Sequence, residues 1–268
     1  MNMHELAGRQ KFAETLAVKA GQLALEMRSN LAPAEAKSAI DFCTEADRAV
    51  EKLVRGEIAA AYGEPVLGEE YGQDGGSDVG NGLWVVDPID GTTEYIHGSA
   101  RWCVSLAFLR DGIIELGVIY EPVGKRLFSA RAGQGASLNG APIRVSHLAH
   151  GTAPVIEVGW SERRSLDAYC DLLHMLVASR MEFRRRGSGA LGLADVACGI
   201  NDAYVELHIN SWDAVAGILL VREAGGWTND FLAGNGLTEG NLIMAATPEL
   251  HQPLTALVPP GGDRLQAY

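Results

Sequence analysis

A short apolar run that leads into a proline and two aspartates constrains the fold of this chain more than any other segment. Residues 83–86 (Leu-Trp-Val-Val) are typical of a buried strand, and the chain continues as Asp-Pro-Ile-Asp-Gly-Thr-Thr over residues 87–93. We expect Pro88 to stop regular strand pairing, Gly91 to let the backbone approach a ligand, and the two threonines to open a helix. Carboxylates suit hard cations and a helix N-terminus suits anions. The pattern therefore predicts a metal site beside a phosphate site.

The size and charge of the chain limit what it can bind. Its 268 residues are enough for one large domain or two closely packed halves, and 47% of them are hydrophobic and 21% charged, as in ordinary globular proteins. The net charge of −12 argues against a nucleic acid or an anionic membrane as partner. It does not argue against a phosphorylated substrate, because a bound divalent cation can invert the local charge.

The cysteines and the N-terminus predict a cytoplasmic protein. The four cysteines are scattered without a Cys-x-x-Cys pair, which favours reduced thiols over disulfides or a zinc site. The first residues lack the basic and apolar segments of a secretory signal, and no apolar stretch is long enough for a transmembrane helix.

Hydrophobic periodicity predicts interleaved helices and strands, and hence a layered α/β fold. Helical spacing covers residues 13–27 and 44–58, and an Asp-Gly turn signal at residues 111–112 joins two predicted strands. The other predicted helices are 167–178, 189–198, 212–223 and one from Pro248, and the other predicted strands are 65–68, 104–109, 113–120, 126–130, 155–158, 182–184, 203–207 and 242–245.

Taken singly, the acidic residues have ordinary structural explanations. Asp87 and Asp90 could converge on a cation with the Ile89 carbonyl, but Asp and Gly also favour plain turns. Glu69 and Glu70 repel each other in a way that a cation would relieve, although an exposed charged loop is the commoner case.

Two further acids lie at predicted helix starts. Asp47 ends a Thr-Glu-Ala-Asp sequence with the spacing of a capping box, which locally favours a purely structural role. Asp213 lies in a first helical turn, where an acid is favourable with the helix dipole.

The combination of motifs is more specific than its parts. Gly-Glu-Glu at 68–70, Asp-Pro-Ile-Asp-Gly-Thr-Thr at 87–93 and Trp-Asp-Ala-Val-Ala-Gly at 212–217, in this order, resemble the inositol monophosphatase family over nearly the whole chain. These are magnesium-dependent, lithium-sensitive phosphatases that include fructose-1,6-bisphosphatases and nucleotide 3′-phosphatases. The resemblance implies a layered αβαβα sandwich formed by one domain over residues 1–268, with the metal motifs in about 1–145 and the substrate pocket in about 146–268. It also implies a homodimer.

The resemblance implies a set of ligands for two or three Mg²⁺ ions. Glu69, Asp87 and the Ile89 carbonyl would hold the first ion. Asp87, Asp90 and Asp213 would hold the second, and Glu69 would share a weaker third.

The resemblance also implies roles around the substrate. Thr92 and Asp47 would position and deprotonate the attacking water, with Glu69 also part of the catalytic centre. Gly91 and Thr92 would donate backbone N–H groups to the phosphate. The remaining matched positions would line the pocket near the metals or the leaving group: Lys37, Ser161, Gly189, Glu206 and Asp213. Ser188 lacks the spacing of a nucleophile elbow, so we expect it to serve packing.

Several residues depart from the family pattern and leave the substrate open. Glu94 replaces a common Asn, residues 99–102 (Ser-Ala-Arg-Trp) lack the usual proline, and Trp160 alters the neighbourhood of Ser161. The basic run at residues 184–186 would either meet a second anionic group or form an exposed strand end.

The sequence thus predicts a Mg²⁺-dependent phosphatase of small phosphorylated polyols, with inositol 1-phosphate as the first substrate. Histidinol phosphate, sugar phosphates such as fructose 1,6-bisphosphate, and 3′-phosphonucleotides are the alternatives within the family. A catalytically idle interaction protein is the alternative of another class.

Overall fold

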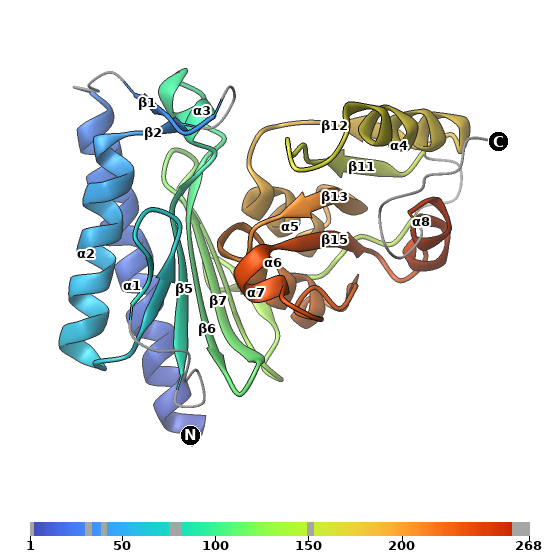
Figure 1. Ribbon diagram of the computed structural model, residues 1–268. Coiled ribbons are helices and arrows are strands. Elements are labelled where there is room, and N and C mark those ends of the chain that lie inside the picture. The colour runs from blue at the N-terminus through green and yellow to red at the C-terminus, as the bar shows by residue number, and fades with distance from the viewer. Residues whose placement is uncertain (1–2, 30–33, 39–41, 75–81, 149–152, 259–268) are drawn as a thin grey trace.

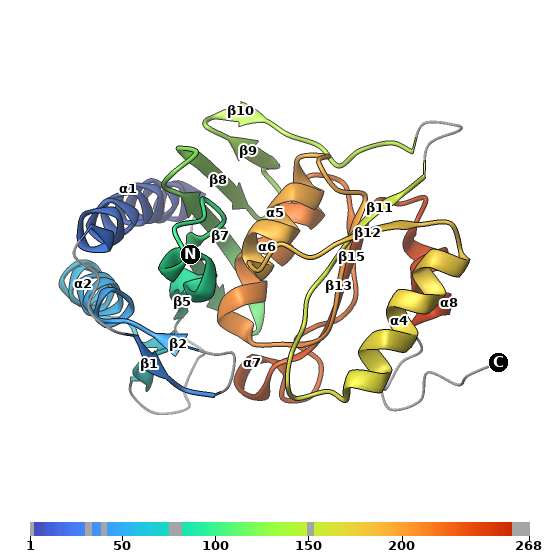
Figure 2. The same ribbon diagram turned by 90° about the horizontal axis from the view of Figure 1, so that it is seen from above.

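Helices and sheets alternate in layers through the molecule, in the order helix, sheet, helix, sheet, helix (Figures 1 and 2). The computed structural model describes residues 3–29, 34–38, 42–74, 82–148 and 153–258. The αβαβα sandwich expected from the sequence is confirmed.

Six helices form the three helical layers. One pair covers the outer face of the first sheet, a second pair lies between the sheets, and a third covers the outer face of the second sheet (Figure 2). In this order the pairs are α1 (Met3–Arg28) and α2 (Glu45–Ala61), α5 (Gly189–Ala197) and α6 (Ser211–Glu223), and α4 (Leu166–Ala178) and α8 (His251–Leu257).

The first sheet has eight strands in the order β10-β9-β8-β7-β6-β5-β3-β4. In chain order they are β3 (Val66–Gly68), β4 (Gly72–Gln73), β5 (Leu83–Asp90), β6 (Cys103–Arg110), β7 (Ile113–Glu121), β8 (Arg126–Arg131), β9 (Ala136–Leu138) and β10 (Ala141–Pro142). Most neighbours pair antiparallel, but β3 and β5 run parallel, so both end at the same edge of the sheet.

The second sheet has five strands in the order β12-β11-β13-β15-β14. They are β11 (Val155–Val158), β12 (Glu182–Arg184), β13 (Ala203–Ile209), β14 (Trp227–Thr228) and β15 (Asn241–Ala246). The remaining short elements are the β1–β2 pair and two short helices: β1 (Glu35–Ala36), β2 (Phe42–Cys43), α3 (Thr92–Ile96) and α7 (Gly236–Glu239).

The apolar run that forms the first half of β5 is buried on both faces of the first sheet. Leu83 and Val85 belong to the core beneath α5 and α6, while Trp84 and Val86 belong to the core beneath α1 and α2. Both cores need apolar side chains from this strand, which explains why the run does not alternate with polar residues.

Two boundaries differ from those expected. Pro88 does interrupt regular pairing, because the register against β6 shifts between Asp87 and Asp90, but β5 itself continues to Asp90. On the other side, pairing with β3 ends at Val86, so the missing N–H of the proline removes no bond there. At the other end of the chain, Pro248 lies in a turn and α8 begins at His251.

In the described part of the chain, none of the helices combines the length and the hydropathy that crossing a bilayer requires.

Candidate active site

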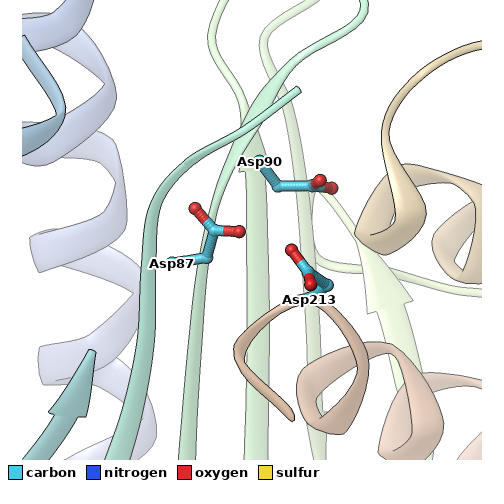
Figure 3. Close-up of side chains that lie close together, drawn as sticks. All are labelled: Asp87, Asp90 and Asp213. Carbon is cyan, nitrogen blue, oxygen red and sulfur yellow. The ribbon is translucent and has the colours of Figure 1, made fainter. Parts of the chain in front are cut away.

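Three aspartates from two separate elements converge between the sheets. Asp87 and Asp90 lie in the last four residues of β5, and Asp213 lies in the first turn of α6. Figure 3 shows their carboxylates pointing toward one another, and one oxygen from each lies within 4.8 Å of the others. The bulge in β5 explains the convergence, because Asp87 and Asp90 would otherwise point to opposite faces of the sheet.

The N-terminus of α5 fixes the orientation of Asp90. The Ser188 hydroxyl and the backbone N–H of Ala190 both donate to Asp90 Oδ2, the latter over 2.8 Å, and the Gly189 N–H donates to Oδ1 over 3.3 Å. Ser188 also caps the helix through the N–H of Leu191. An acid at a helix N-terminus is favourable, but burial raises the pKa of Asp90 and outweighs these three donors, which lower it.

The three aspartates carry more negative charge than their surroundings neutralise. Burial and then the neighbouring acids raise the pKa of Asp87 well above its ordinary value, and burial followed by Asp90 raises the pKa of Asp213 to about 7. Asp87 Oδ2 is buried without a hydrogen-bond donor, and in the described regions no Lys or Arg forms an ion pair with the three acids. Buried carboxylates in this state need protons or a bound cation. The donor set therefore fits a hard divalent ion such as Mg²⁺.

Glu69 lies beside the three aspartates but outside their group. It follows β3 and lines the same cleft, and its charge contributes to the raised pKa of Asp87. Its carboxylate accepts a hydrogen bond from Lys37 Nζ over 2.8 Å, while the same ammonium contacts Glu70 at 2.6 Å. Burial alone would lower the pKa of Lys37, but the two glutamates outweigh it and raise the pKa. That Glu69 is a metal ligand stays a prediction.

Asp47 combines a cap with a contact to the candidate catalytic threonine. Its Oδ2 accepts from the N–H and the hydroxyl of Thr44, which completes the expected capping box of α2. Its Oδ1 accepts from the Thr92 hydroxyl over 3.2 Å, and that hydroxyl also lies 3.1 Å from the Ile89 carbonyl oxygen. Burial raises the pKa of Asp47 to about 6. One carboxylate thus serves the helix and the site with different oxygens.

A cleft of about 640 Å³ opens beside these groups. Of the residues assigned to catalysis, metal or substrate, all except Asp47 and Lys37 line it: Glu69, Asp87, Ile89, Asp90, Gly91, Thr92, Ser161, Gly189, Glu206 and Asp213. Gly91 has a φ of +93°, and a β-carbon there would lie 2.9 Å from the Arg101 carbonyl oxygen, so a larger residue would be strained. The structure brings the predicted residues together, and their individual roles stay predictions.

The substrate end of the cleft is lined by side chains of several chemical types. Trp160 lines it and packs edge-on against Tyr169, with ring centroids 4.9 Å apart. Ser161 accepts from the N–H of Arg163 over 3.3 Å, and Glu94 faces the cleft beside Gly187. This end offers aromatic, acidic and basic groups to a leaving group.

The three arginines at residues 184–186 have different surroundings. Arg184 is exposed on β12, and Arg185 is exposed at the lining of the cleft. Arg186 bonds the buried carboxylates of Glu157 and Asp195.

Sequence reasoning missed the part played by Ser188 and by Arg101. Ser188 was expected to serve packing, but its hydroxyl holds Asp90 and caps α5. The helix start after Ser188 was predicted, and the contact to Asp90 was not. Arg101, in the segment that departs from the family pattern, bonds Asp195 over 2.6 Å and Glu157 over 3.0 Å. No local sequence pattern predicts contacts between residues this far apart in the chain.

Comparison with known proteins agrees with this geometry. Residues 5–260 match the model of the Inositol monophosphatase family. A relative named Nus factor SuhB from Xylella fastidiosa is 40% identical over 198 residues, which cover 73% of this chain and 71% of that protein. Nus factor SuhB from Pseudomonas aeruginosa is 37% identical over 230 residues, covering 84% of this chain and 85% of the relative.

Solved structures show the same fold. The extragenic suppressor protein suhB from Bartonella henselae superposes with a TM-score of 0.83 at 34% identity, covering 92% of this chain and 96% of its own. The Thermotoga maritima IMPase superposes with a TM-score of 0.82 at 30% identity, covering 93% of this chain and 96% of its own. By sequence, by fold and by the placement of its acidic residues, this chain belongs to the inositol monophosphatase family.

Proposed function

We propose that this chain hydrolyses small phosphate monoesters in a Mg²⁺-dependent reaction, with inositol 1-phosphate as the preferred substrate. The observation that carries the proposal is the group of three converging aspartates, whose charge no described basic side chain neutralises. It lies in the same cleft as Gly91 and Thr92, and Asp47 contacts this cleft through the Thr92 hydroxyl. The groups needed to hold a cation, a phosphate and a water are therefore neighbours.

Asp87, Asp90 and Asp213 are the residues that would hold the metal, with Glu69 and the Ile89 carbonyl as further ligands. When bound, Mg²⁺ supplies charge neutralisation for the phosphate and makes water more acidic. The requirement is large, because phosphate-monoester hydrolysis is among the slowest uncatalysed reactions.

Asp47 and Thr92 are the residues that would handle the proton of the attacking water. The Thr92 hydroxyl has one proton and two acceptors within reach, Asp47 Oδ1 and the Ile89 carbonyl oxygen. If Thr92 donates to Ile89, its oxygen is free to orient a water while Asp47 accepts the proton. A pKa of about 6 suits Asp47 for this exchange near neutral pH. The N–H groups of Gly91 and Thr92 would hold the phosphate.

The leaving group would contact the side of the cleft formed by Ser161, Gly189 and Glu206. A carboxylate such as Glu206 favours a hydroxyl-rich alcohol, but it would also accept the ammonium of histidinol phosphate. A neighbouring Staphylococcus aureus structure, SaIMPase-II, has been solved with inositol monophosphate and with 2′AMP, each at 25% identity to this chain. Sugar phosphates and nucleotides therefore belong in the substrate panel.

Phosphate release from a panel of substrates tests the proposal. Inositol 1-phosphate, histidinol phosphate, fructose 1,6-bisphosphate and a 3′-phosphonucleotide are compared by kcat/KM, with Mg²⁺ and with EDTA. We expect release only with Mg²⁺, highest kcat/KM for inositol 1-phosphate, and a fall of at least about a hundredfold in Asp90→Asn. Asp111→Asn makes the same change at an exposed hairpin turn and should leave activity unaltered. Hydrolysis that persists in EDTA and in Asp90→Asn would contradict the mechanism.

A second candidate function is an interaction role without catalysis. The observation that favours it is that sequence relatives are named Nus factors, a name that points to transcription rather than to metabolism. Absence of phosphate release from every substrate, in a folded protein supplied with Mg²⁺, would favour this role. It would also reopen the expectation, drawn from net charge, that the chain has no nucleic-acid partner.

A further inference from the structure

A buried tyrosine contacts the carboxylate that is expected to bind the leaving group. Tyr204 and Glu206 are two residues apart on β13, so their side chains lie on the same face of the strand. Tyr204 is 1% exposed, and its hydroxyl donates to Glu206 Oε2 over 2.6 Å. Burial and the nearby Glu206 raise the pKa of Tyr204 well above its ordinary value, so the phenol keeps the proton that it donates.

Three glycines make room for this pair. A β-carbon on Gly159 would lie 2.0 Å from Glu206 Oε2 and 2.5 Å from the Tyr204 hydroxyl oxygen. A β-carbon on Gly192 would lie 2.5 Å from the Tyr204 ring, and one on Gly189 would lie 3.1 Å from its hydroxyl. Real β-carbons do not approach as closely as those at Gly159 and Gly192 would, and the contact at Gly189 would be tight, so the tyrosine and the glutamate occupy a slot that these glycines leave open.

The slot is built by both elements that border the leaving-group side of the cleft. Gly159 directly follows β11, which pairs with β13, while Gly189 and Gly192 belong to α5, which lies against the same sheet (Figure 2). The ring is therefore held from two sides and has no room to turn away from the carboxylate.

Glu206 is left with one oxygen for a ligand. Its Oε2 accepts the hydrogen bond from Tyr204, and its Oε1 has no hydrogen-bond partner among the described residues. Glu206 lines the cleft, so this second oxygen is available to a ligand. A carboxylate that is not tied rotates freely about its last bond and offers either oxygen. The tyrosine removes that freedom.

We propose that Tyr204 is a positioning residue that fixes Glu206 with only Oε1 turned to the substrate, so that the cleft selects leaving groups with a hydroxyl at that place. The inference rests on the proposed phosphatase function and on Glu206 as its leaving-group contact. It assigns the selectivity to a pair of residues rather than to the carboxylate alone.

Tyr204→Phe tests the proposal, because phenylalanine still fills the slot and loses only the hydroxyl. We expect the KM for inositol 1-phosphate to rise about tenfold with kcat within about twofold of wild type, since positioning rather than chemistry is lost. The KM for 4-nitrophenyl phosphate, whose leaving group carries no further hydroxyl, should not change. A purely structural role would move both substrates together.

A double-mutant cycle shows whether Tyr204 acts through Glu206. Glu206→Gln should raise the same KM at least as much, and Tyr204→Phe should add nothing in the Glu206→Gln background. Independent, additive losses would overturn the proposal, as would an unchanged KM for inositol 1-phosphate in Tyr204→Phe.

Two further variants separate the effect from general loss of structure. Tyr95→Phe makes the same change at a fully buried tyrosine, whose hydroxyl donates to the Ala24 carbonyl over 2.8 Å, and should leave both KM values unaltered. Gly159→Ala pushes on the Tyr204–Glu206 hydrogen bond from the other side, and should reproduce the selective rise in KM if Tyr204→Phe does not fold. The Tm of every variant is recorded.

The wild-type protein separates this inference from the proposed function. If it neither hydrolyses inositol 1-phosphate with Mg²⁺ nor binds it in a calorimetric titration with Ca²⁺ in place of Mg²⁺, both the function and the role of Tyr204 are overturned. If wild type is active and Tyr204→Phe matches it on both substrates, only the positioning role is overturned.

Discussion

Two groups of buried or half-buried acids in the described part of the chain have opposite surroundings. Glu157 and Asp195, each 1% exposed, are neutralised by guanidinium groups from both halves of the chain. Asp87, Asp90 and Asp213 have no ion pair with any Lys or Arg that the structure describes.

The neutralised group, which we call the arginine hub, consists of Glu157, Asp195 and three arginines. Arg101 bonds both acids, Arg126 bonds Asp195 over 3.0 Å, and Arg186 bonds both acids. Arg101 and Arg126 belong to the part of the chain that forms the first sheet, whereas Glu157 lies on β11 and Asp195 on α5. The hub therefore ties the two sheets together.

The difference shows what the second group lacks. A chain that supplies three arginines to one buried acidic pair is able to neutralise buried charge from its own side chains. Leaving three aspartates without such partners costs stability unless a cation arrives from outside. The contrast thus supports a metal function for the aspartates, and each prediction below tests one side of it.

The largest effect is expected for Asp87→Asn. Asp87 Oδ1 accepts a hydrogen bond from the Ile89 N–H over 2.9 Å, and the asparagine oxygen can accept the same bond. The substitution removes one negative charge from the three aspartates. We expect phosphatase activity to fall about a thousandfold or more, because one of the proposed metal-binding carboxylates is lost. The Tm of the metal-free protein should rise at the same time, since repulsion among the acids is relieved. A fall in both quantities would contradict the contrast, and Asp111→Asn is the control.

The same Asp-to-Asn change in the arginine hub should lower the stability of the protein. Asp195→Asn leaves three buried or half-buried guanidinium groups short of a partner, so we expect a loss of about 3–5 kcal/mol in the free energy of unfolding. Urea denaturation measures it. A loss below about 1 kcal/mol would show that the hub is not what holds these charges.

The sequence anticipated the two groups unequally. The aspartates and Glu69 stand in short motifs next to strand and helix ends, so their convergence followed from the resemblance, and the capping box of Asp47 followed from a four-residue spacing. The hub joins Arg101 to residues 56 and 94 positions away, and no local pattern predicts such pairs. The contact from Ser188 to Asp90 was missed for the same reason.

The boundary errors have a local physical cause. Pro88 was expected to stop regular pairing, because proline cannot donate to a ladder, and it does so without ending the strand. In the structure it lies beyond the last residue that pairs with β3 and inside a bulge against β6, where no donor is required. Whether a proline falls on a paired or an unpaired edge depends on the neighbours of the strand, which the sequence alone does not give.

Binding of Mg²⁺ should stabilise the protein only through the unneutralised group. At a free concentration about a hundred times Kd, a ligand that binds only the folded state adds about 3 kcal/mol to its stability. We expect a corresponding rise in Tm for wild type and for Asp195→Asn, and none for Asp87→Asn. Thermal scans with EDTA and with increasing Mg²⁺ measure the rise, and an equal rise in Asp87→Asn would contradict a site at these aspartates.

The metal-free protein should lose stability as the pH rises. Burial and neighbouring acids raise the pKa of Asp87 well above its ordinary value, the pKa of Asp213 to about 7 and that of Glu206 to about 8. Between pH 4 and these values the folded state binds more protons than the unfolded state, so stability falls with increasing pH. The fall is smaller than the sum of the separate contributions of Asp87 and Asp213, because coupled acids share protons rather than binding one each. Thermal scans in EDTA from pH 5 to pH 8 test this, and Mg²⁺ should flatten the curve.

The smallest effects on the free energy of unfolding are expected for substitutions of Arg186 and Arg184. The Arg186 side chain is 30% exposed and bonds two acids that keep Arg101 as a partner, so Arg186→Met should cost only about 1 kcal/mol. Arg184 is exposed on β12, and Arg184→Met should change the free energy of unfolding by less than about 0.5 kcal/mol. If Arg186 instead bound a second anionic group of the substrate, Arg186→Met would raise the KM for fructose 1,6-bisphosphate and leave stability unchanged. Urea denaturation and kinetics on the same two variants therefore decide whether the arginine belongs to the hub or to the substrate.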